Sequence, residues 1–335
     1  MEQSRGHRPL LQESITVSST SHEVPVAAPY RLDLTVCALR RLSTNVVDVL
    51  TPNGQYVRAH DGLNGPVIAR VTQAREDALV VTIQGDAGEH ARTLALVRQM
   101  LGVDRDLSEF ESAAATIPWL APLVERMRGV KPPRYPSLWE ASANAIVFQQ
   151  VSLRAASTIM HRLIVAVGQP VDVEGTPVRL YTFPTAERVQ AAPDSLLRSA
   201  GLSASKMGAL RRVIDALATG TLDATTLDGC ASRDAAAMLC RIKGIGPWTA
   251  AVILLRGLGR LDVFPANDTS VASNIALVAG AAPLDVPRLL KDLGSQCGML
   301  YFALLLARLE ARGEIGRPSL QSSEPSALRV PSASD

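Results

Sequence analysis

The sequence predicts an α+β protein in which a small antiparallel β-sheet precedes an all-helical body. Two patterns support this prediction. Apolar and polar residues alternate in short runs up to residue 83, and turn residues such as Pro52, Asn53 and Gly54 separate these runs. After residue 107, apolar residues recur instead every three or four positions. The chain has 335 residues, of which 47% are hydrophobic, so it is long enough to bury two or three packed subdomains.

The β-rich domain is expected over residues 29–110. Candidate strands lie at residues 32–36, 55–58, 67–71 and 79–83. Leu94, Val97 and Leu101 then follow at helical spacing, which predicts a helix packed against the sheet. Residues 1–28, rich in Ser, Glu and His, and the Ser/Pro tract 317–335 show no hydrophobic period, so both are predicted to be disordered tails.

The helical body is expected over residues 111–316. Helical periodicity marks residues 119–127, 137–167, 193–200, 206–218, 232–239, 249–256, 270–278 and 287–312. Ser137 and Glu140 fit a capping box at the start of the second of these segments, where each would bond a backbone amide near the other.

Composition restricts the functions that this chain can have. Lys and Arg total 34 against 32 Asp and Glu, so a polyanionic partner must be argued from local patches rather than from the net charge of +2. The four cysteines form no CxxC pair, which argues against zinc, an iron–sulfur cluster or a disulfide framework. No apolar run is long enough for a membrane span and no secretory core is present, so a cytoplasmic, nucleoid-associated protein without a membrane partner is expected.

Residues 239–250 join two predicted helices through a short glycine-containing turn. Gly244 and Gly246 flank one aliphatic residue, and glycine allows a tight turn whose amides point outward at the start of the next helix. Unpaired amides and the helix dipole favour a phosphate at such a position, and Arg241 and Lys243 add positive charge. Two glycines between helices also occur in simple connections, so this pattern alone leaves both interpretations open.

Asp268 is the candidate catalytic carboxylate. It follows Pro265, which ends any helix, and precedes the helix expected from residue 270, so by itself it is better explained as a helix N-cap. Asp262 is the nearest rival, but it stands before an apolar segment. An ionised carboxylate stabilises the oxocarbenium character that develops when an N-glycosidic bond breaks, and a helix N-terminus favours the ionised form.

The turn together with Asp268 resembles the helix-hairpin-helix (HhH-GPD) DNA glycosylases, and within them the 3-methyladenine DNA glycosylase II family, over roughly residues 30–311. Residues 134–140 and 144–152 look like that family's first core helix, whose final turn wedges into the duplex. By position the wedge is Gln150 with Gln149 beside it; a buried polar helix residue is the alternative. Lys206, with Arg211 and Arg212, looks like the family's basic linker, although a solvated basic face explains these three equally well.

The resemblance implies roles for further residues. DNA contacts are expected from Gln149, Gln150, Lys206, Arg241, Lys243, Gly244, Ile245, Gly246 and Thr249, and the base pocket from Trp248, Val252, Thr269 and Tyr301. A Na⁺ or K⁺ ion is expected on the backbone carbonyls of Cys240, Ile242 and Ile245. No cofactor is required and no iron–sulfur cluster is expected.

The implied function is a monofunctional glycosylase of base excision repair. Relatives that also cut the strand carry a lysine two positions after the second hairpin glycine, where this chain has Trp248, so no AP lyase step is expected. The expected substrate is double-stranded DNA with alkylated bases of the 3-methyladenine and 7-methylguanine type, acted on by a monomer. Relatives that act on alkylated purines line the pocket with several aromatic residues; because this chain has only 4% aromatic residues, a more open or more aliphatic pocket is expected, which leaves a narrower or different lesion range open. The competing hypotheses are a DNA-binding module without catalysis and a helical scaffold.

Overall fold

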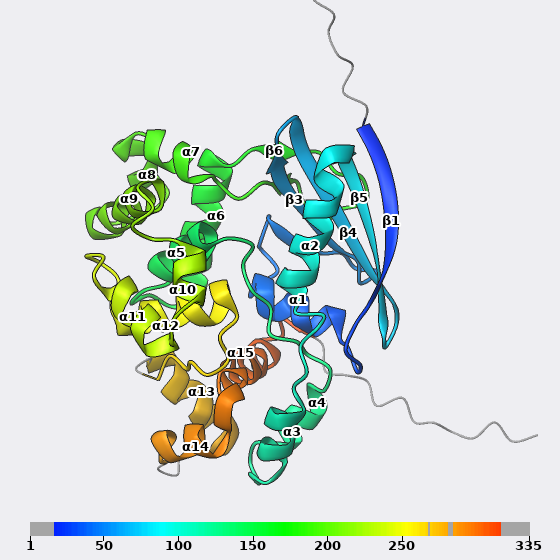
Figure 1. Ribbon diagram of the computed structural model, residues 1–335, viewed down its shortest axis with the longest axis vertical. Coiled ribbons are helices and arrows are strands. Elements are labelled where there is room, and N and C mark those ends of the chain that lie inside the picture. The colour runs from blue at the N-terminus through cyan, green and yellow to red at the C-terminus, as the bar shows by residue number, and fades with distance from the viewer. Residues whose placement is uncertain (1–16, 267–268, 281–283, 316–335) are drawn as a thin grey trace, which may run out of the picture.

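The computed structural model describes residues 17–266, 269–280 and 284–315, and it has the predicted α+β architecture. Its N-terminal part contains a five-stranded antiparallel sheet with strand order β1-β5-β4-β3-β2 (Figure 1). The strands are β1 (Val17–Pro25), β2 (Asp48–Leu50), β3 (Tyr56–Gly62), β4 (Gly65–Arg75) and β5 (Ala78–Asp86). Helix α2 (His90–Leu101), predicted from its spacing, lies across one face of the sheet.

Two expectations for the N-terminal region are wrong. Val17–Pro25, expected in a disordered tail, pairs along its whole length with β5 as an edge strand. Leu32–Arg40, expected to begin as a strand, is helix α1. Nearly every residue of α1 is buried, because the helix lies between the sheet and the helical body. The alternation of Leu32, Leu34 and Val36 was misleading, because periodicity alone cannot assign so short an apolar run to a helix or a strand.

Helices form most of the remaining chain, as predicted. They are α3 (Ser108–Ala115), α4 (Ala121–Arg126), α5 (Leu138–Val147), α6 (Leu153–Val167), α7 (Ala186–Ala191), α8 (Asp194–Ser199), α9 (Ala204–Ala218), α10 (Ala224–Asp228), α11 (Ser232–Cys240), α12 (Pro247–Ile253), α13 (Thr269–Ala279), α14 (Val286–Asp292) and α15 (Met299–Ala311). Leu254–Leu258 continue α12 as a π-helical turn. A two-stranded ladder of β6 (Pro170–Val171) and β7 (Leu180–Tyr181) is an exception to the all-helical expectation.

Segment 137–167, predicted as one helical stretch, is two helices separated by a turn at residues 148–152. Only half of the expected capping box forms at its start. The Ser137 hydroxyl accepts a hydrogen bond from the Glu140 amide, but the Glu140 carboxylate bonds to Arg58 of the sheet instead of returning to the Ser137 amide. Packing between the two halves of the chain therefore overrides this local capping preference.

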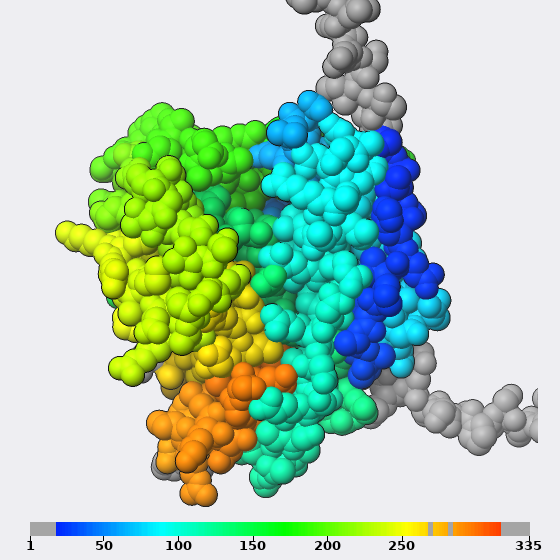
Figure 2. Space-filling model, viewed as in Figure 1, coloured from blue at the N-terminus to red at the C-terminus, as the bar shows by residue number. Residues whose placement is uncertain are grey.

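The hydrophobic core crosses the expected domain boundary at residue 110. One cluster of buried residues fills the space between the sheet, α1 and α2 and includes Tyr135 and Ala141 from the helical body. A second joins α1 to α13 and α15, and a third lies between α5, α9, α11 and α12. The N-terminal part (blue to cyan) and the helices therefore lie side by side as one packed unit (Figure 2). Among the described residues, no helix is both long and apolar enough to cross a membrane.

Candidate active site

The hairpin between α11 and α12 is a tight turn that needs glycine at one of its two glycine positions. The Ile245 amide donates to the Ile242 carbonyl at 2.9 Å and closes the turn. Gly244 has φ +105°, and a Cβ there would lie 2.7 Å from the Ala209 Cβ. Gly246 has an ordinary φ of −95°, and a Cβ there would meet nothing within 4 Å. Gly244 is therefore required by the fold, whereas Gly246 faces open space where a partner can approach the backbone.

The hairpin presents charge outward and aliphatic residues inward. Arg241 and Lys243 are exposed, while Ile245 is buried and Ile242 packs against the helical core. Gly246 is the N-cap of α12, so the first turn of that helix follows the two basic residues within a few positions of the chain. This arrangement of amides and cations is suited to an anion such as a backbone phosphate.

Gln149 fastens the turn after α5 to the hairpin. Its Nε2 donates to the Gly244 carbonyl at 2.9 Å and to the Thr249 hydroxyl at 2.7 Å. Thr249 is 2% exposed, so it holds Gln149 rather than facing solvent. Gln149 and Thr249, both expected to contact DNA, thus bond to each other and join the hairpin to the turn after α5.

Gln150, the expected wedge, projects from that turn. It is exposed and has φ +54°, a left-handed conformation that is uncommon for residues other than glycine. The backbone on either side is fixed, because Ser152 caps α6 by accepting from the Ala155 amide and Gln149 is bonded to the hairpin. The apex of the turn therefore points outward from a rigid base.

The basic residues of the linker make contacts within the chain and are partly exposed. The Lys206 ammonium donates to the Val147 carbonyl at the end of α5 at 2.7 Å, and burial lowers its pKa. Arg211 pairs with Asp194 at 2.5 Å, and Arg212 donates to the Lys243 carbonyl at 2.6 Å. Each of these three partly exposed side chains therefore has a partner within the chain, and its contact with DNA stays a prediction.

Asp268, the expected catalytic residue, lies outside the described residues. Thr269 begins α13, but its side chain is also outside the description. The rival carboxylate, Asp262, is exposed in the segment before Phe264.

The expected pocket residues separate into two environments. Val252 is buried in the core beneath the hairpin, and Trp248 is half-buried against the same cluster. Tyr301 instead lines a cavity of about 190 Å³. The described residues around this cavity are Arg41, Phe148, Ser152, Leu153, Val271, Ser273, Asn274, Tyr301, Leu304, Leu305, Arg308 and Arg312. It therefore borders the turn that carries Gln150 and the helix that begins one residue after Asp268.

Two arginines that the sequence did not indicate stand beside Tyr301. Although burial opposes the change, the charges of Arg41 and Arg256 and their hydrogen bonds lower the pKa of the Tyr301 phenol. Arg256 is fully buried in the π-helical turn, and its Nη2 donates to the carbonyls of Ala38 and Leu39 at 2.9 Å each. It thereby ties the helix after the hairpin to the last turn of α1.

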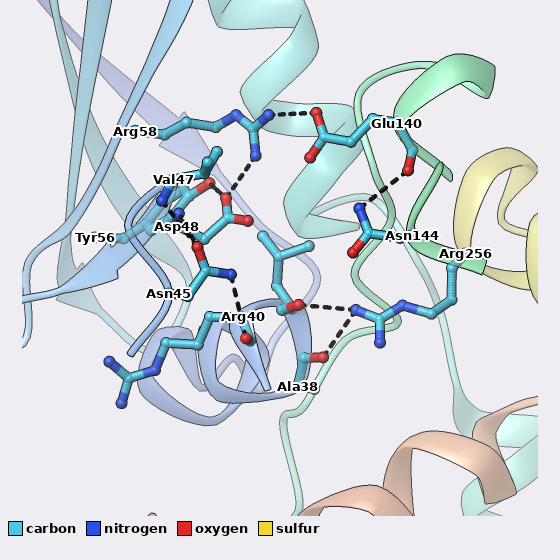
Figure 3. Close-up of polar contacts among 11 residues, drawn as sticks. Ala38, Arg40, Asn45, Val47, Asp48, Tyr56, Arg58, Glu140, Asn144 and Arg256 are labelled. Atoms are coloured by element: carbon cyan, nitrogen blue, oxygen red, sulfur yellow. Dashed lines mark hydrogen bonds and ion pairs between the residues drawn. The ribbon is translucent and has the colours of Figure 1, made fainter. Parts of the chain in front are cut away.

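A buried ionic network also joins the sheet to α5 (Figure 3). Arg58 pairs with Asp48 at 2.7 Å and with Glu140 at 2.6 Å, and the Tyr56 hydroxyl donates to Asp48 at 2.8 Å. One guanidinium cannot neutralise two buried carboxylates. Burial, assisted by the Asp48 charge and opposed by Arg58, consequently raises the pKa of Glu140 from 4.5 to about 7.

The cysteines remain scattered in the structure. All four are free, with Cys37 and Cys297 buried and Cys240 exposed at the end of α11. Within the described part of the chain, no cluster of three or more His, Cys, Asp or Glu side chains is arranged to hold a metal ion.

Comparisons with known proteins agree with this geometry. Residues 143–293 match the family model of the HhH-GPD superfamily base excision DNA repair proteins, a span that contains the turn after α5, the hairpin and Asp268. The chain is 32% identical over 261 residues to a probable bifunctional transcriptional activator/DNA repair enzyme AlkA of Mycobacterium tuberculosis, covering 76% of this chain and 51% of that protein. The chain thus spans about half the length of this curated relative.

Two further matches extend over more of the compared protein. The putative DNA-3-methyladenine glycosylase YfjP of Bacillus subtilis is 26% identical, with 76% of this chain and 85% of YfjP covered. The solved structure of a 3-methyladenine DNA glycosylase from Archaeoglobus fulgidus superposes with a TM-score of 0.71 at 24% identity, over 86% of this chain and 98% of that one, which shows a shared fold. Residues 143–293 thus match the HhH-GPD superfamily of base excision DNA repair proteins, and the chain is similar in sequence and fold to proteins named as 3-methyladenine DNA glycosylases.

Proposed function

We propose that this protein is a monofunctional DNA glycosylase of base excision repair that flips alkylated bases, such as 3-methyladenine and 7-methylguanine, out of double-stranded DNA and removes them by hydrolysis. The observation that carries the proposal is the bracing of the hairpin against the turn of Gln150 through Gln149. A phosphate-binding turn and an exposed, rigidly based side chain are thereby held at one fixed separation, as an enzyme that extrudes a nucleotide requires.

The chemistry rests on Asp268, which immediately precedes α13. An ionised carboxylate at the start of a helix stabilises positive charge that develops on the deoxyribose and helps to orient water. A base that already carries a positive charge departs without a strong acid, so one carboxylate suffices for alkylated purines. Trp248 stands where bifunctional relatives have a Schiff-base lysine, which supports hydrolysis without strand cleavage.

We also propose a Na⁺ or K⁺ site at the hairpin. The proposed ligands are the backbone carbonyls of Cys240, Ile242 and Ile245. The other two carbonyls of this turn, those of Lys243 and Gly244, already accept hydrogen bonds from the side chains of Arg212 and Gln149. The Ile242 carbonyl already accepts one amide, and a carbonyl oxygen has a second lone pair for a cation. Bound there, the ion would add positive charge to the phosphate-binding turn. We further propose a monomer that acts on the nucleoid in the cytoplasm.

The test is release of 3-methyladenine and 7-methylguanine from methylated duplex DNA by the wild type and by Asp268→Asn. We expect release by the wild type and a loss of about a hundredfold or more in the variant, since it keeps the size and polarity of the side chain but not its charge. Equal release by both proteins would remove Asp268 from the mechanism. No release by the wild type, with DNA binding retained, would favour a non-catalytic DNA-binding module. Strand nicking without alkali would contradict the monofunctional assignment.

A further inference from the structure

The turn between α5 and α6, residues 148–152, has ends and an apex in different surroundings. Phe148 and Ser152, at its two ends, line the cavity of about 190 Å³ that Tyr301 also borders. Gln150, at its apex, is exposed. An extruded base occupies a pocket, and the stack that it has left contains a gap. This one turn therefore offers a cavity wall at its ends and a projecting side chain at its apex.

The two neighbouring glutamines of this turn differ in what their amides can still bind. The Gln149 Nε2 donates to the Gly244 carbonyl at 2.9 Å and to the Thr249 hydroxyl at 2.7 Å, so both of its N–H groups are in use. The Gln150 side chain is exposed, and its amide carries two N–H donors and one carbonyl acceptor. Gln149 thus fixes the turn, whereas the amide of Gln150 is accessible to a partner outside the chain.

The backbone at Gln150 does not account for the presence of a glutamine. Its φ of +54° is disfavoured for residues with a Cβ, whereas glycine adopts such a conformation without a steric penalty. The conformation is held by the Gln149 hydrogen bonds on one side and by the Ser152 cap of α6 on the other. The contribution of Gln150 therefore lies in its long polar side chain.

A gap between stacked bases is a poor environment for an amide that has no partner. Burying an amide without a hydrogen bond costs free energy, and an alkyl side chain of the same size would avoid that cost. One surface in the gap can satisfy the amide, namely the Watson–Crick edge of the base that has lost its partner. Opposite a damaged purine this base is thymine or cytosine, and each carries a donor next to an acceptor on that edge. The acceptor and donor of a glutamine amide match this pair of groups.

We propose that the Gln150 amide hydrogen-bonds to the Watson–Crick edge of the unpaired pyrimidine in the undamaged strand. With thymine, Nε2 donates to a ring carbonyl and Oε1 accepts from N3–H. With cytosine, Nε2 donates to N3 and Oε1 accepts from the N4 amino group. The inference rests on the base extrusion of the proposed function and adds recognition of the opposite strand to it.

The test measures binding to duplexes that carry a tetrahydrofuran abasic-site analogue, which has no base to excise. The base opposite is thymine or 2,4-difluorotoluene, which has the shape of thymine but forms only very weak hydrogen bonds. Fluorescence anisotropy gives the affinities of the wild type, Gln150→Met and Gln150→Ala. Gln190→Met is the matched control, because it makes the same change at an exposed glutamine of α7, whose Nε2 donates to Asp215. Thermal unfolding of each variant confirms that it is folded.

We expect the wild type to bind the thymine duplex about tenfold more tightly than the difluorotoluene duplex, as for one or two hydrogen bonds. Gln150→Met fills the gap without hydrogen bonds, so its two affinities should agree within about twofold and lie near that of the wild type for difluorotoluene. Gln150→Ala should bind both duplexes more weakly and equally, and it decides the pairing even if Gln150→Met fails to fold. Gln190→Met should keep the preference of the wild type for thymine.

Two results would overturn the inference while leaving the proposed function to the release of methylated bases: a wild type with equal affinity for both duplexes, or a thymine preference that persists in Gln150→Met. A wild type that binds the abasic duplex no more tightly than an undamaged one would refute base extrusion and this inference together. The expected preference in a protein that releases no methylated base would support the contact and refute the hydrolysis alone.

Discussion

The two hairpin glycines offer a sharp test, because the structure assigns them different roles. Replacing Gly244 with Ala places a Cβ 2.7 Å from the Ala209 Cβ at a φ of +105°. The left-handed conformation costs an alanine about 1–2 kcal/mol, and overpacking adds about 1–3 kcal/mol. The Gly244→Ala protein should therefore lose several kcal/mol of its free energy of unfolding. Gly246→Ala meets nothing within 4 Å at a φ that alanine adopts readily, so its stability should stay within about 1 kcal/mol of the wild type.

In DNA binding, we expect an effect of Gly246→Ala even though this variant keeps its stability. In Gly246→Ala the new methyl group occupies the open space in which a phosphate would approach the backbone, so we expect roughly tenfold weaker binding, or about 1.4 kcal/mol. Urea unfolding gives the stabilities, and fluorescence anisotropy with a labelled duplex gives the affinities. A stable Gly244→Ala protein would refute the steric argument. Wild-type affinity in the well-folded Gly246→Ala protein would refute a close approach of DNA to this backbone.

Two further predictions concern buried and exposed charge. Because the pKa of Glu140 is raised from 4.5 to about 7, its protonated form is favoured in the folded protein, and this stabilisation is present below about pH 4.5 and lost as pH rises through 7. Such a rise corresponds to about 3 kcal/mol. Glu140→Gln, which imitates the protonated acid, should therefore lose less of its free energy of unfolding than the wild type between about pH 5 and pH 8, as measured by urea titrations. An equal loss in both proteins would contradict the assignment. For DNA binding, Lys243→Gln should reduce the slope of log affinity against log salt by about 0.9, the value for one phosphate contact, whereas Lys206→Gln should leave the slope unchanged because its ammonium is bonded to Val147. Equal slopes in both variants would remove Lys243 from the phosphate-binding surface.

Sequence alone predicted the features that depend on local chemistry. The order of strands and helices followed largely from periodicity, since amphipathic elements must repeat every two or about 3.6 residues to face one core. The hairpin was recognisable because a turn with positive φ needs glycine, and Gly244 has that conformation. In α1, a short and mostly buried helix, the few apolar residues fit a strand as well as a helix, and the prediction of a strand was wrong.

Tertiary structure decided which polar side chains are bonded to distant parts of the chain. Lys206, Arg211 and Arg212 were grouped by charge, yet each is bonded within the chain. Conversely, nothing in the sequence distinguished Arg41 from Arg40, although only Arg41 stacks on Phe148 and lines the cavity beside Tyr301. The physical reason is that a charged side chain takes its role from partners distant in the sequence, and only the fold brings those partners together.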